Sequence, residues 1–317
     1  MPPRDEAPPR ITVVGSLNTD LVIRAPHLPA IGETVSGGEF ATFPGGKGAN
    51  QAVAAARLGA RVAMVGCVGG DDFGRRLAGG LIADGVDVAH VRVDAASASG
   101  TALITVDPHG QNTIVVAPGA NWRLTPEDVA RAATLIADSA ILLLQLEVPI
   151  GAVLAASRIA RDHGVRVVLD PAPAPAEPLP GELYRLVDVL NPNEGEAEAL
   201  SAAAVPDAPA AGAAAEELLR RGTRAVVMKL GARGAYVHDG TRSEVVPGIR
   251  VDAVDTTAAG DAFAGALAVA LAEGKALIGA VYFANAAAAL SVTRRGAQPS
   301  MPFRAEVEAF ARAHLSR

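Results

Sequence analysis

The chain has 317 residues, half of them hydrophobic, which is enough to bury a large core in one domain or two. Its net charge of −6 disfavours a nucleic-acid-binding surface, because phosphate binding needs a basic face. The single cysteine, Cys67, excludes an internal disulfide and is expected to be a buried thiol, which is compatible with a reducing cytoplasm.

Two segments bear on whether the chain carries a signal peptide or crosses a membrane. Residues 1–10, MPPRDEAPPR, are rich in proline and charge and lack the apolar core of a signal peptide, so they predict a disordered tail. Residues 276–292 approach membrane-spanning length, but they are mostly alanine and contain Asn285, which favours a buried helix. We therefore expect no membrane contact and a single domain over residues 11–317.

Short apolar runs alternate with longer Ala-rich stretches along the chain. Helices are expected over residues 48–59 and 71–85, each ending at a glycine. Continuous apolar strands separated by helices indicate a mostly parallel sheet with helices on both faces, an α/β fold in three layers. The strands expected are ITVVG (11–15), RVAMVGCV (61–68), AILLLQL (140–146), VRVVLD (165–170), LVDVLN (186–191) and RAVVMKL (224–230).

Two stretches, 21–43 and 99–121, break this alternation. Both combine β-forming residues with turn signals and have little helical character. They predict β-hairpin insertions that form a small separate sheet, a lid built from about residues 20–44 and 99–120. The Pro-rich segment 171–180 is expected to be a loop within the domain, because the alternation continues beyond it.

Polar side chains follow most of the predicted strands, where ligands bind in parallel α/β sheets. Each one alone is equally typical of a helix cap or a turn. Taken together, they predict a site along one edge of the sheet. The residues are Asn18, Asp20, Glu147, Asp170, Asn191, Asn193, Glu194, Glu196 and Lys229.

The segment FPGGKGANQ opens a predicted helix at Gly45 and Gly46. Two glycines let a ligand approach the backbone, and free N–H groups at a helix start favour polar or anionic atoms. Gly48 follows Lys47 where a Walker A loop has Ser or Thr. The chain also lacks a GxGxxG fingerprint, an HExxH motif and a Cys/His cluster, and no GxSxG elbow supports a catalytic triad.

The segment DTTAAGDAF, residues 255–263, places small residues before Gly260 and an acid, Asp261, at a predicted helix start. Such a turn exposes several backbone N–H groups, and the helix adds its positive end, so an anion hole for a phosphoryl group is indicated. The helix field favours the ionised form of Asp261, which predicts a weak base, and phosphoryl transfer tolerates a weak base. From these residues alone, a simple helix cap is an equally good interpretation.

Eight motifs in this order resemble the ribokinase family of carbohydrate kinases, from about Ile11 to about Pro302: GSLNTD, GGKGANQAVAAARLGA, PGAN, QLEVP, NPNEGEAE, KLGARG, DTTAAGDAFAGAL and FANAAAALSVTRRGAQPS. The resemblance implies ATP-dependent phosphorylation of the 5-hydroxyl of D-ribose. It implies that Asp261 is the general base and that Ala258, Ala259 and Gly260 form the backbone anion hole.

The resemblance also implies binding sites. The sugar site comprises Asn18, Asp20, Gly45, Gly46, Lys47, Asn50 and Glu147, a set of carboxylates and amides that suits a neutral polyol. The nucleotide site comprises Asn193 and Glu196, which help place Mg²⁺ and phosphates, then Lys229, Gly231, Gly234, Gly260 and, near the adenine, Asn285. A monovalent cation, K⁺, is implied at Asp255, Thr257, Ser291, Arg294, Gly296 and Ser300. Lys229 departs from the Thr that is common at its position in the family. The resemblance also implies a homodimer formed through the lid.

Three other interpretations stay open at this point. Another sugar or nucleoside kinase of the same family, such as a fructokinase, differs only in its substrate. A non-catalytic sugar sensor on the same fold would have lost the base or the glycine motif, and both are present. A nucleotide-binding oxidoreductase is disfavoured by the missing dinucleotide fingerprint.

Overall fold

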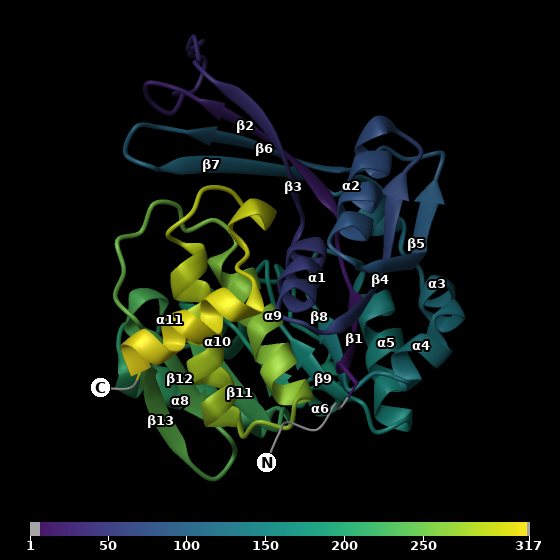
Figure 1. The fold of residues 1–317 in the computed structure, drawn as a ribbon, viewed down its shortest axis with the longest axis vertical. Helices are drawn as coiled ribbons and strands as arrows, with labels where there is room; N and C mark the ends of the chain where they lie inside the picture. The colour runs from purple at the N-terminus through teal and green to yellow at the C-terminus, as the bar shows by residue number, and fades with distance from the viewer. Residues whose placement is uncertain (1–6, 316–317) are drawn as a thin grey trace.

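The chain folds around a nine-stranded sheet in a computed structural model that describes residues 7–315 (Figure 1). The strand order is β13-β12-β11-β10-β9-β8-β1-β4-β5. Seven strands are parallel: β1 (Arg10–Val14), β4 (Arg61–Gly69), β5 (Asp87–Asp94), β8 (Ile141–Leu144), β9 (Arg166–Leu169), β10 (Val189–Leu190) and β11 (Ala225–Lys229). Two antiparallel strands, β12 (Gly234–His238) and β13 (Ser243–Pro247), complete one edge.

The central strands are buried on both faces because their residues are apolar without alternation. Val13 of β1 lies opposite Met64 on one side and Leu143 on the other, and all three are fully buried. The predicted strands are present, but β5, β12 and β13 were not predicted. The edge strands β5 and β13 mix charged and apolar residues, as edge strands do, whereas β12, GAYVH, is an inner strand that is mostly buried.

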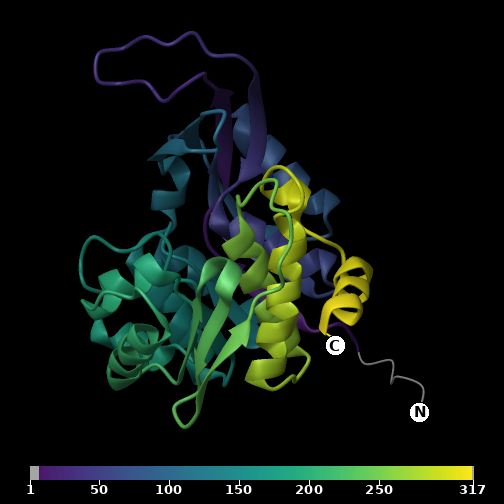
Figure 2. The same cartoon turned by 90° about the vertical axis from the view of Figure 1, so that its left-hand side faces the viewer.

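Helices cover both faces of the sheet and close two hydrophobic cores (Figure 2). One core involves α1 (Lys47–Arg57), α2 (Asp72–Ala83), α9 (Ala259–Ala272), α10 (Leu277–Ser291) and α11 (Arg304–Leu315). The other involves α3 (Pro126–Arg131), α4 (Ala133–Ala137), α5 (Ile150–Asp162), α6 (Gly181–Leu186), α7 (Glu194–Ser201) and α8 (Ala208–Arg220). The predicted three-layer α/β fold is confirmed.

Residues 276–292, which approach membrane-spanning length, contain the 15-residue helix α10, and this helix packs against α9. Within residues 7–315, none of the helices has the length and apolar character needed to cross a bilayer. The predicted tail falls mostly on residues 1–6, which lie outside the described part of the chain, and Arg10 already belongs to β1.

A second sheet of four strands stands above the body and is the small sheet that the fold class included (Figure 1). Its order is β3-β2-β6-β7, with β2 (Asn18–Arg24), β3 (Phe40–Gly45), β6 (Gly100–Val106) and β7 (Asn112–Ala117). Two antiparallel hairpins are joined by a parallel β2–β6 pairing, in which Asp20 lies opposite Ala102. Because β2 begins four residues after β1 ends, the start of this sheet adjoins the carboxyl edge of the large one.

Helix α1 is held unusually close to its neighbours by glycines. A Cβ atom on Gly48 would lie 2.6 Å from the backbone nitrogen of Ser16. A Cβ atom on Gly265 of α9 would lie 2.7 Å from the Cβ of Ala54 and 3.0 Å from the carbonyl oxygen of Gln51. Only glycine permits these approaches, so α1 is fixed between the end of β1 and α9.

We predict that Gly265→Ala destabilises the protein by about 1–3 kcal/mol, because the added methyl group overpacks the α1–α9 contact. Urea unfolding measures the change. Gly80→Ala in α2 is the matched control, since no atom lies within 4 Å of its Cβ position. The control is expected to stabilise by about 0.5–1 kcal/mol through helix propensity, and equal effects of the two substitutions would contradict the packing argument.

Candidate active site

The start of α1 is enclosed by the end of β1 and by Glu147. The backbone N–H of Lys47 donates to Glu147 Oε2 at 3.0 Å, and that carboxylate also accepts from the Ser16 hydroxyl. The N–H of Gly48 donates to Ser16 Oγ at 3.3 Å, and the N–H of Ala49 donates to the Ser16 carbonyl at 2.9 Å. The helix-start N–H groups expected to be free are therefore occupied by Ser16 and Glu147.

The carboxylate of Asp261 is buried in the first turn of α9, which begins at Ala259 and not at Asp261 as expected. Its two oxygens each accept one amide hydrogen bond, from Asn50 Nδ2 at 2.9 Å and from Gln51 Nε2 at 3.0 Å. Burial raises the pKa of Asp261, although Lys47 and the two amides oppose this. The prediction of a weak base is thus wrong, because burial outweighs the groups that stabilise the charge.

Asp20 and Asn18 lie on β2 beside this carboxylate. A Cβ atom on Gly45 would lie 2.3 Å from the Asp20 carboxylate, so the glycine makes room for that acid. Burial, together with the charges of Glu147 and Asp261, raises the pKa of Asp20 to about 7. Asp20 therefore changes its charge near neutral pH.

Asn121, in the short helix η1 (Gly119–Arg123), fixes Asn18 and was not predicted as a site residue. Its Nδ2 donates to Asn18 Oδ1 at 2.7 Å and to the Leu17 carbonyl at 3.1 Å, while its Oδ1 accepts from the Leu17 N–H at 2.9 Å. The Asn18 oxygen is thereby engaged. The motif PGAN was the available signal for this residue.

Lys47 supplies positive charge to this acidic region. Burial alone would lower its pKa, but the carboxylates of Asp261, Asp170 and Glu147 outweigh burial and raise the pKa overall. The ammonium of Lys47 therefore stays charged. Without it, the carboxylates would repel one another inside a partly buried site.

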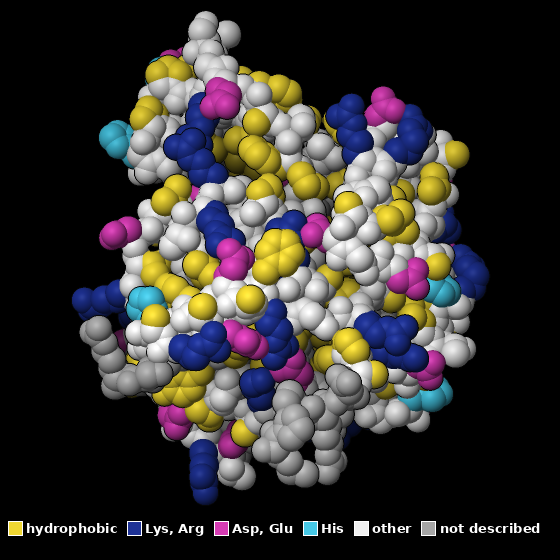
Figure 3. Space-filling view, in the orientation of Figure 1, with side chains coloured by type: hydrophobic (Ala, Val, Ile, Leu, Met, Phe, Trp, Pro, Cys, Tyr) yellow, Lys and Arg dark blue, Asp and Glu magenta, His cyan; other side chains and the backbone are white. Residues whose placement is uncertain are grey.

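A hollow of about 730 Å³ lies between the small sheet and the loops around residues 253–257 and 295–297. Asp20, Arg24 and Phe43 contribute from the sheet, and Asp255, Thr257 and Gly296 contribute from the loops. The hollow lies below the small sheet in the space-filling view (Figure 3). Of the predicted sugar-site residues, Asp20 lines this hollow.

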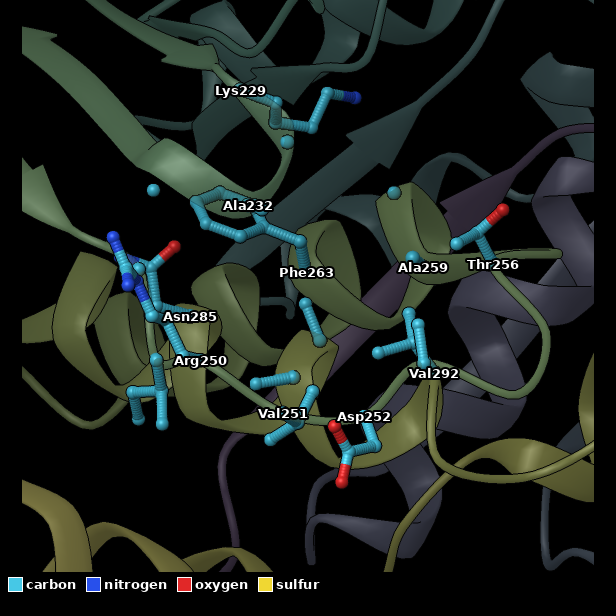
Figure 4. Close-up of a pocket in the computed structure, with 18 residues that line it drawn as sticks. Lys229, Ala232, Arg250, Val251, Asp252, Thr256, Ala259, Phe263, Asn285 and Val292 are labelled. Carbon is cyan, nitrogen blue, oxygen red and sulfur yellow. The ribbon is translucent and has the colours of Figure 1, made fainter.

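A second cavity, of about 700 Å³, lies along α9 and α10 and brings together five of the predicted nucleotide residues. In Figure 4, Lys229 and Ala259 lie toward one end and Asn285 and Arg250 toward the other, with Phe263 between them. Cavities of this size and mixed lining suit a nucleotide. The predicted residues that line it are Lys229, Gly231, Gly234, Gly260 and Asn285.

Two of these residues also shape the cavity wall. Gly234 has φ of 100°, and a Cβ there would lie 2.1 Å from the Val246 carbonyl oxygen. The Asn285 amide donates to the Pro247 carbonyl at 3.2 Å, so it anchors the end of β13. Both positions therefore have a structural reason for their residue type as well as a place in the cavity.

The predicted anion hole precedes α9. Ala258 adopts the left-handed conformation, with φ of 58°, which is uncommon and costly for a residue with a Cβ. Within the described part of the chain, no side chain caps this helix start, and the Ala259 N–H donates weakly to Thr256 at 3.3 Å. The uncapped turn presents backbone N–H groups and the positive end of α9 to the cavity.

Asn193 and Glu196 do not line the cavity and instead form a capping box on α7. Glu196 Oε2 accepts from the Asn193 N–H at 2.7 Å, and the Asn193 side chain accepts from the Glu196 N–H at 2.8 Å. A β-bridge joins Asn193 to Lys229, and burial raises the pKa of Glu196 while Lys229 opposes it. Carboxylate oxygens are the protein donors that Mg²⁺ uses together with phosphates, so Glu196 fits such an ion, whereas both oxygens of Asp170 are taken by Lys229 and Gln51.

The loop residues predicted to hold a cation are brought together only in part. Asp255 accepts from the N–H groups of Thr257 and Gly296, both at 2.9 Å. Burial would raise its pKa, but these hydrogen bonds outweigh burial and lower it. The Ser291 and Ser300 hydroxyls donate to local carbonyls, and the Arg294 guanidinium pairs with Glu306 of α11 at 2.6 Å, away from the loop.

Residues 8–304 match the sequence profile of the pfkB family carbohydrate kinases. The chain belongs to this family. A ribokinase of Haemophilus influenzae is 44% identical over 300 residues, covering 95% of this chain and 97% of the relative. A deoxyribokinase of Salmonella typhi is 37% identical, covering 92% of this chain and 95% of the relative. The solved structure of an Arabidopsis thaliana ribokinase complexed with ribose and ATP superposes with a TM-score of 0.88 at 34% identity, covering 96% of this chain and 99% of that one.

This membership confirms the resemblance drawn from the motifs. Lys229, which stands where Thr is common, has a defined partner in the structure. Lys229 Nζ bonds Asp170 Oδ1 at 2.6 Å, and both side chains are largely buried, at 13% and 2% exposure. The same ammonium lies 3.6 Å from the Cβ position of Gly260, beside the anion hole. In this pfkB kinase, the lysine therefore neutralises a buried acid at the edge of the nucleotide cavity.

We predict that Lys229→Met destabilises the kinase by about 3–5 kcal/mol, because it leaves the Asp170 charge buried and unpaired. Adding Asp170→Asn is expected to recover most of that loss in chemical denaturation. Arg158→Met, which breaks an exposed pair with Glu182, is the matched control and should cost less than about 1 kcal/mol. A Lys229→Met variant as stable as the control would refute the buried-pair argument.

Proposed function

We propose that this kinase transfers the γ-phosphoryl group of ATP to the 5-hydroxyl of D-ribose and releases ADP and D-ribose 5-phosphate. The observation that carries the proposal is the buried Asp261, which two amides hold next to Gly260 of the nucleotide cavity and within electrostatic reach of Asp20 on the sugar side. The ribokinase relative and the ribokinase bound to ribose and ATP support the same substrates.

In the proposed step, Asp261 accepts the proton of the 5-hydroxyl as that oxygen bonds to the γ-phosphorus and the bond to the ADP oxygen breaks. Its raised pKa makes it a better proton acceptor than an ordinary aspartate once it is ionised. The N–H groups at Ala258–Gly260 stabilise the charge on the transferred group. Glu196 would help to hold Mg²⁺, which would supply further neutralisation of the phosphates.

The sugar side is suited to a neutral polyol. Asp20, Asn18 and Asn50 present carboxylate and amide groups, which accept from and donate to neighbouring hydroxyls. Gly45 and Gly46 let β2 pack closely against the start of α1, because a Cβ on Gly46 would lie 2.6 Å from the backbone nitrogen of Asn18. Glu147 holds the start of α1 and thereby the position of Lys47 and Asn50, in addition to any sugar contact.

The proposal includes K⁺ as an activator at the loop of Asp255. Asp255 ties residues 255–257 to Gly296, so an ion bound there would order the loop that leads into the anion hole. Most of the donors would be backbone carbonyls, since the side chains of Ser291, Ser300 and Arg294 are engaged elsewhere.

We also propose a homodimer formed by the small sheet. Strand alternation places Ile23, Phe40, Leu103 and Val115 on its outer face, and these side chains are 38–66% exposed. A contiguous exposed apolar face on a sheet is typical of an interface. The cytoplasmic location indicated by the sequence stays a prediction.

The second candidate is phosphorylation of a related sugar, favoured by the similarity to a deoxyribokinase. A panel of D-ribose, 2-deoxy-D-ribose, D-fructose and adenosine with ATP, run in K⁺ and in Na⁺, separates the candidates. We expect the highest kcat/KM for D-ribose and faster turnover in K⁺. Strong turnover of another member with none of ribose would overturn the proposal.

The variant Asp261→Asn tests the role of Asp261 as the base, because it keeps the side-chain size and removes the proton acceptor. We expect kcat to fall by about 10³-fold or more, within the range for loss of a general base. The Kd for ribose, measured by calorimetry without ATP, should change little, because Asn18, Asp20 and Asn50 remain. Near-normal turnover by the variant would show that Asp261 is not the base.

The raised pKa of Asp20 predicts a pH dependence of ribose binding. Below about pH 7 the folded protein holds Asp20 protonated, and above it the carboxylate is ionised. Sugar hydroxyls that donate to the ionised form stabilise it, so ribose binding should release a proton and tighten as the pH rises. We expect the affinity for ribose to rise by up to about tenfold between pH 6 and pH 8 and to level off above pH 8. Asp20→Asn should bind more weakly with no such slope, and a flat wild-type profile would contradict the assignment.

A further inference from the structure

Beneath Asp261 lies a fully buried amide, Gln51, that the phosphoryl transfer described above does not use. Its Nε2 donates to Asp261 Oδ1 at 3.0 Å and to Asp170 Oδ2 at 2.8 Å. A primary amide nitrogen has two hydrogens, so each carboxylate receives one of them. Gln51 is 0% exposed, so both bonds lie away from bulk solvent.

The orientation of this amide is fixed from behind. Gln51 Oε1 accepts from Gln145 Nε2 at 2.6 Å, and Gln145 is also 0% exposed. A flipped Gln51 amide would direct its oxygen at two carboxylates and lose both bonds. The absence of a side chain at Gly15 makes room for Gln145, whose Oε1 lies 1.9 Å from the position that a Cβ on Gly15 would take.

The anchoring of Gln145 is costly, which argues that the arrangement serves a purpose. Its Oε1 has no hydrogen-bond partner among the described residues, and a buried unpaired carbonyl oxygen is unfavourable. A leucine at position 145 would avoid that cost. What the amide adds is the hydrogen bond that fixes Gln51.

The other end of this chain of contacts reaches the nucleotide side. Lys229 donates to Asp170 Oδ1, Gln51 donates to Asp170 Oδ2, and Gln51 donates again to Asp261. The amide therefore separates two buried carboxylates and holds each in a set orientation. Asn50 holds the second oxygen of Asp261 from the sugar side.

We propose that Gln51 is a positioning residue for the phosphoryl transfer and that Gln145 fixes its amide. Gln51 aims the Asp261 carboxylate at the substrate hydroxyl and keeps it apart from Asp170. This inference rests on the proposed function, because it assigns Asp261 as the base. Gln51 is fully buried and lines neither of the two cavities described above.

The proposal predicts a split between turnover and binding. In Gln51→Leu, Asp261 loses one of its two donors and Asp170 loses its separator, so kcat should fall by about 10²-fold, as for a misplacement of about 1 Å. The KM and the calorimetric Kd for ribose should stay within about threefold, since the sugar-side amides are intact. Gln145→Leu, which frees the amide to flip, should lower kcat by a smaller factor, about tenfold.

A pH profile separates positioning from general loss of structure. Asp261 faces Lys47, Asn50, Asp170 and Gln51, with Asp20 and Glu147 beyond. Removing the Gln51 donor leaves the Asp170 charge unscreened, so the acid limb of kcat should move to higher pH in Gln51→Leu. Ser157→Ala removes a buried hydroxyl on α5, which packs in the other hydrophobic core from α1 and α9, and should leave both kcat and the acid limb unchanged.

The same-size variant Gln51→Glu decides the matter if Gln51→Leu does not fold. A third acid between Asp170 and Asp261 should also lower kcat by about 10²-fold, and it should move the acid limb of the kcat profile to higher pH. Gln51→Glu or Gln51→Leu with kcat within twofold of wild type, or a loss of kcat matched by an equal rise in the ribose Kd, would overturn the proposal. A wild-type enzyme inactive on ribose would instead refute the proposed function.

Discussion

The close contact between α1 and α9 is the constraint on which the site depends. The missing side chain at Gly265 lets the α1 backbone near Gln51 and Ala54 approach α9, and the missing side chain at Gly48 lets the start of α1 approach Ser16. Asn50 and Gln51 lie between these two glycines, and both donate to Asp261 on α9. The distance between base and amides is thus set by backbone packing, which cannot relax by a change of rotamer.

This packing is needed because the site concentrates like charges. Asp20 lies within electrostatic reach of Glu147 and Asp261, and Asp261 within reach of Asp170, so burial and then this repulsion raise the pKa values of Asp20 and Asp261. Two ammonium groups and several amides offset it: Lys47 beside Asp261, Asp170 and Glu147, and Lys229 on Asp170. A site of this kind is stable only when each charge is held by a specific partner.

The sequence predicted what depends on local pattern. The buried strands, the small sheet and the polar groups after β1, β9 and β11 follow from periodicity and turn residues, and the motifs were sufficient to identify the family. The low pKa expected for Asp261 was wrong because its burial comes from tertiary contacts that no local segment specifies. Gln51 and Gln145 were not recognised, since an amide inside a helix or after a strand has no sequence signal for the partner it will meet.

The two halves of the site lie on different parts of the fold: one on the small sheet and the other on elements that pack in the large core. Asn18 and Asp20 belong to β2, and Gly45 ends β3, so the sugar-side groups are continuous with the small sheet, whose outer strands are exposed. Asp261, Gln51 and Lys229 belong to α9, α1 and β11, which pack into the large core. A displacement of the small sheet would move Asp20 relative to Asp261 while leaving the amides on Asp261 in place. Substrate recognition can therefore adapt with the sheet, whereas the geometry of the base is set by the core.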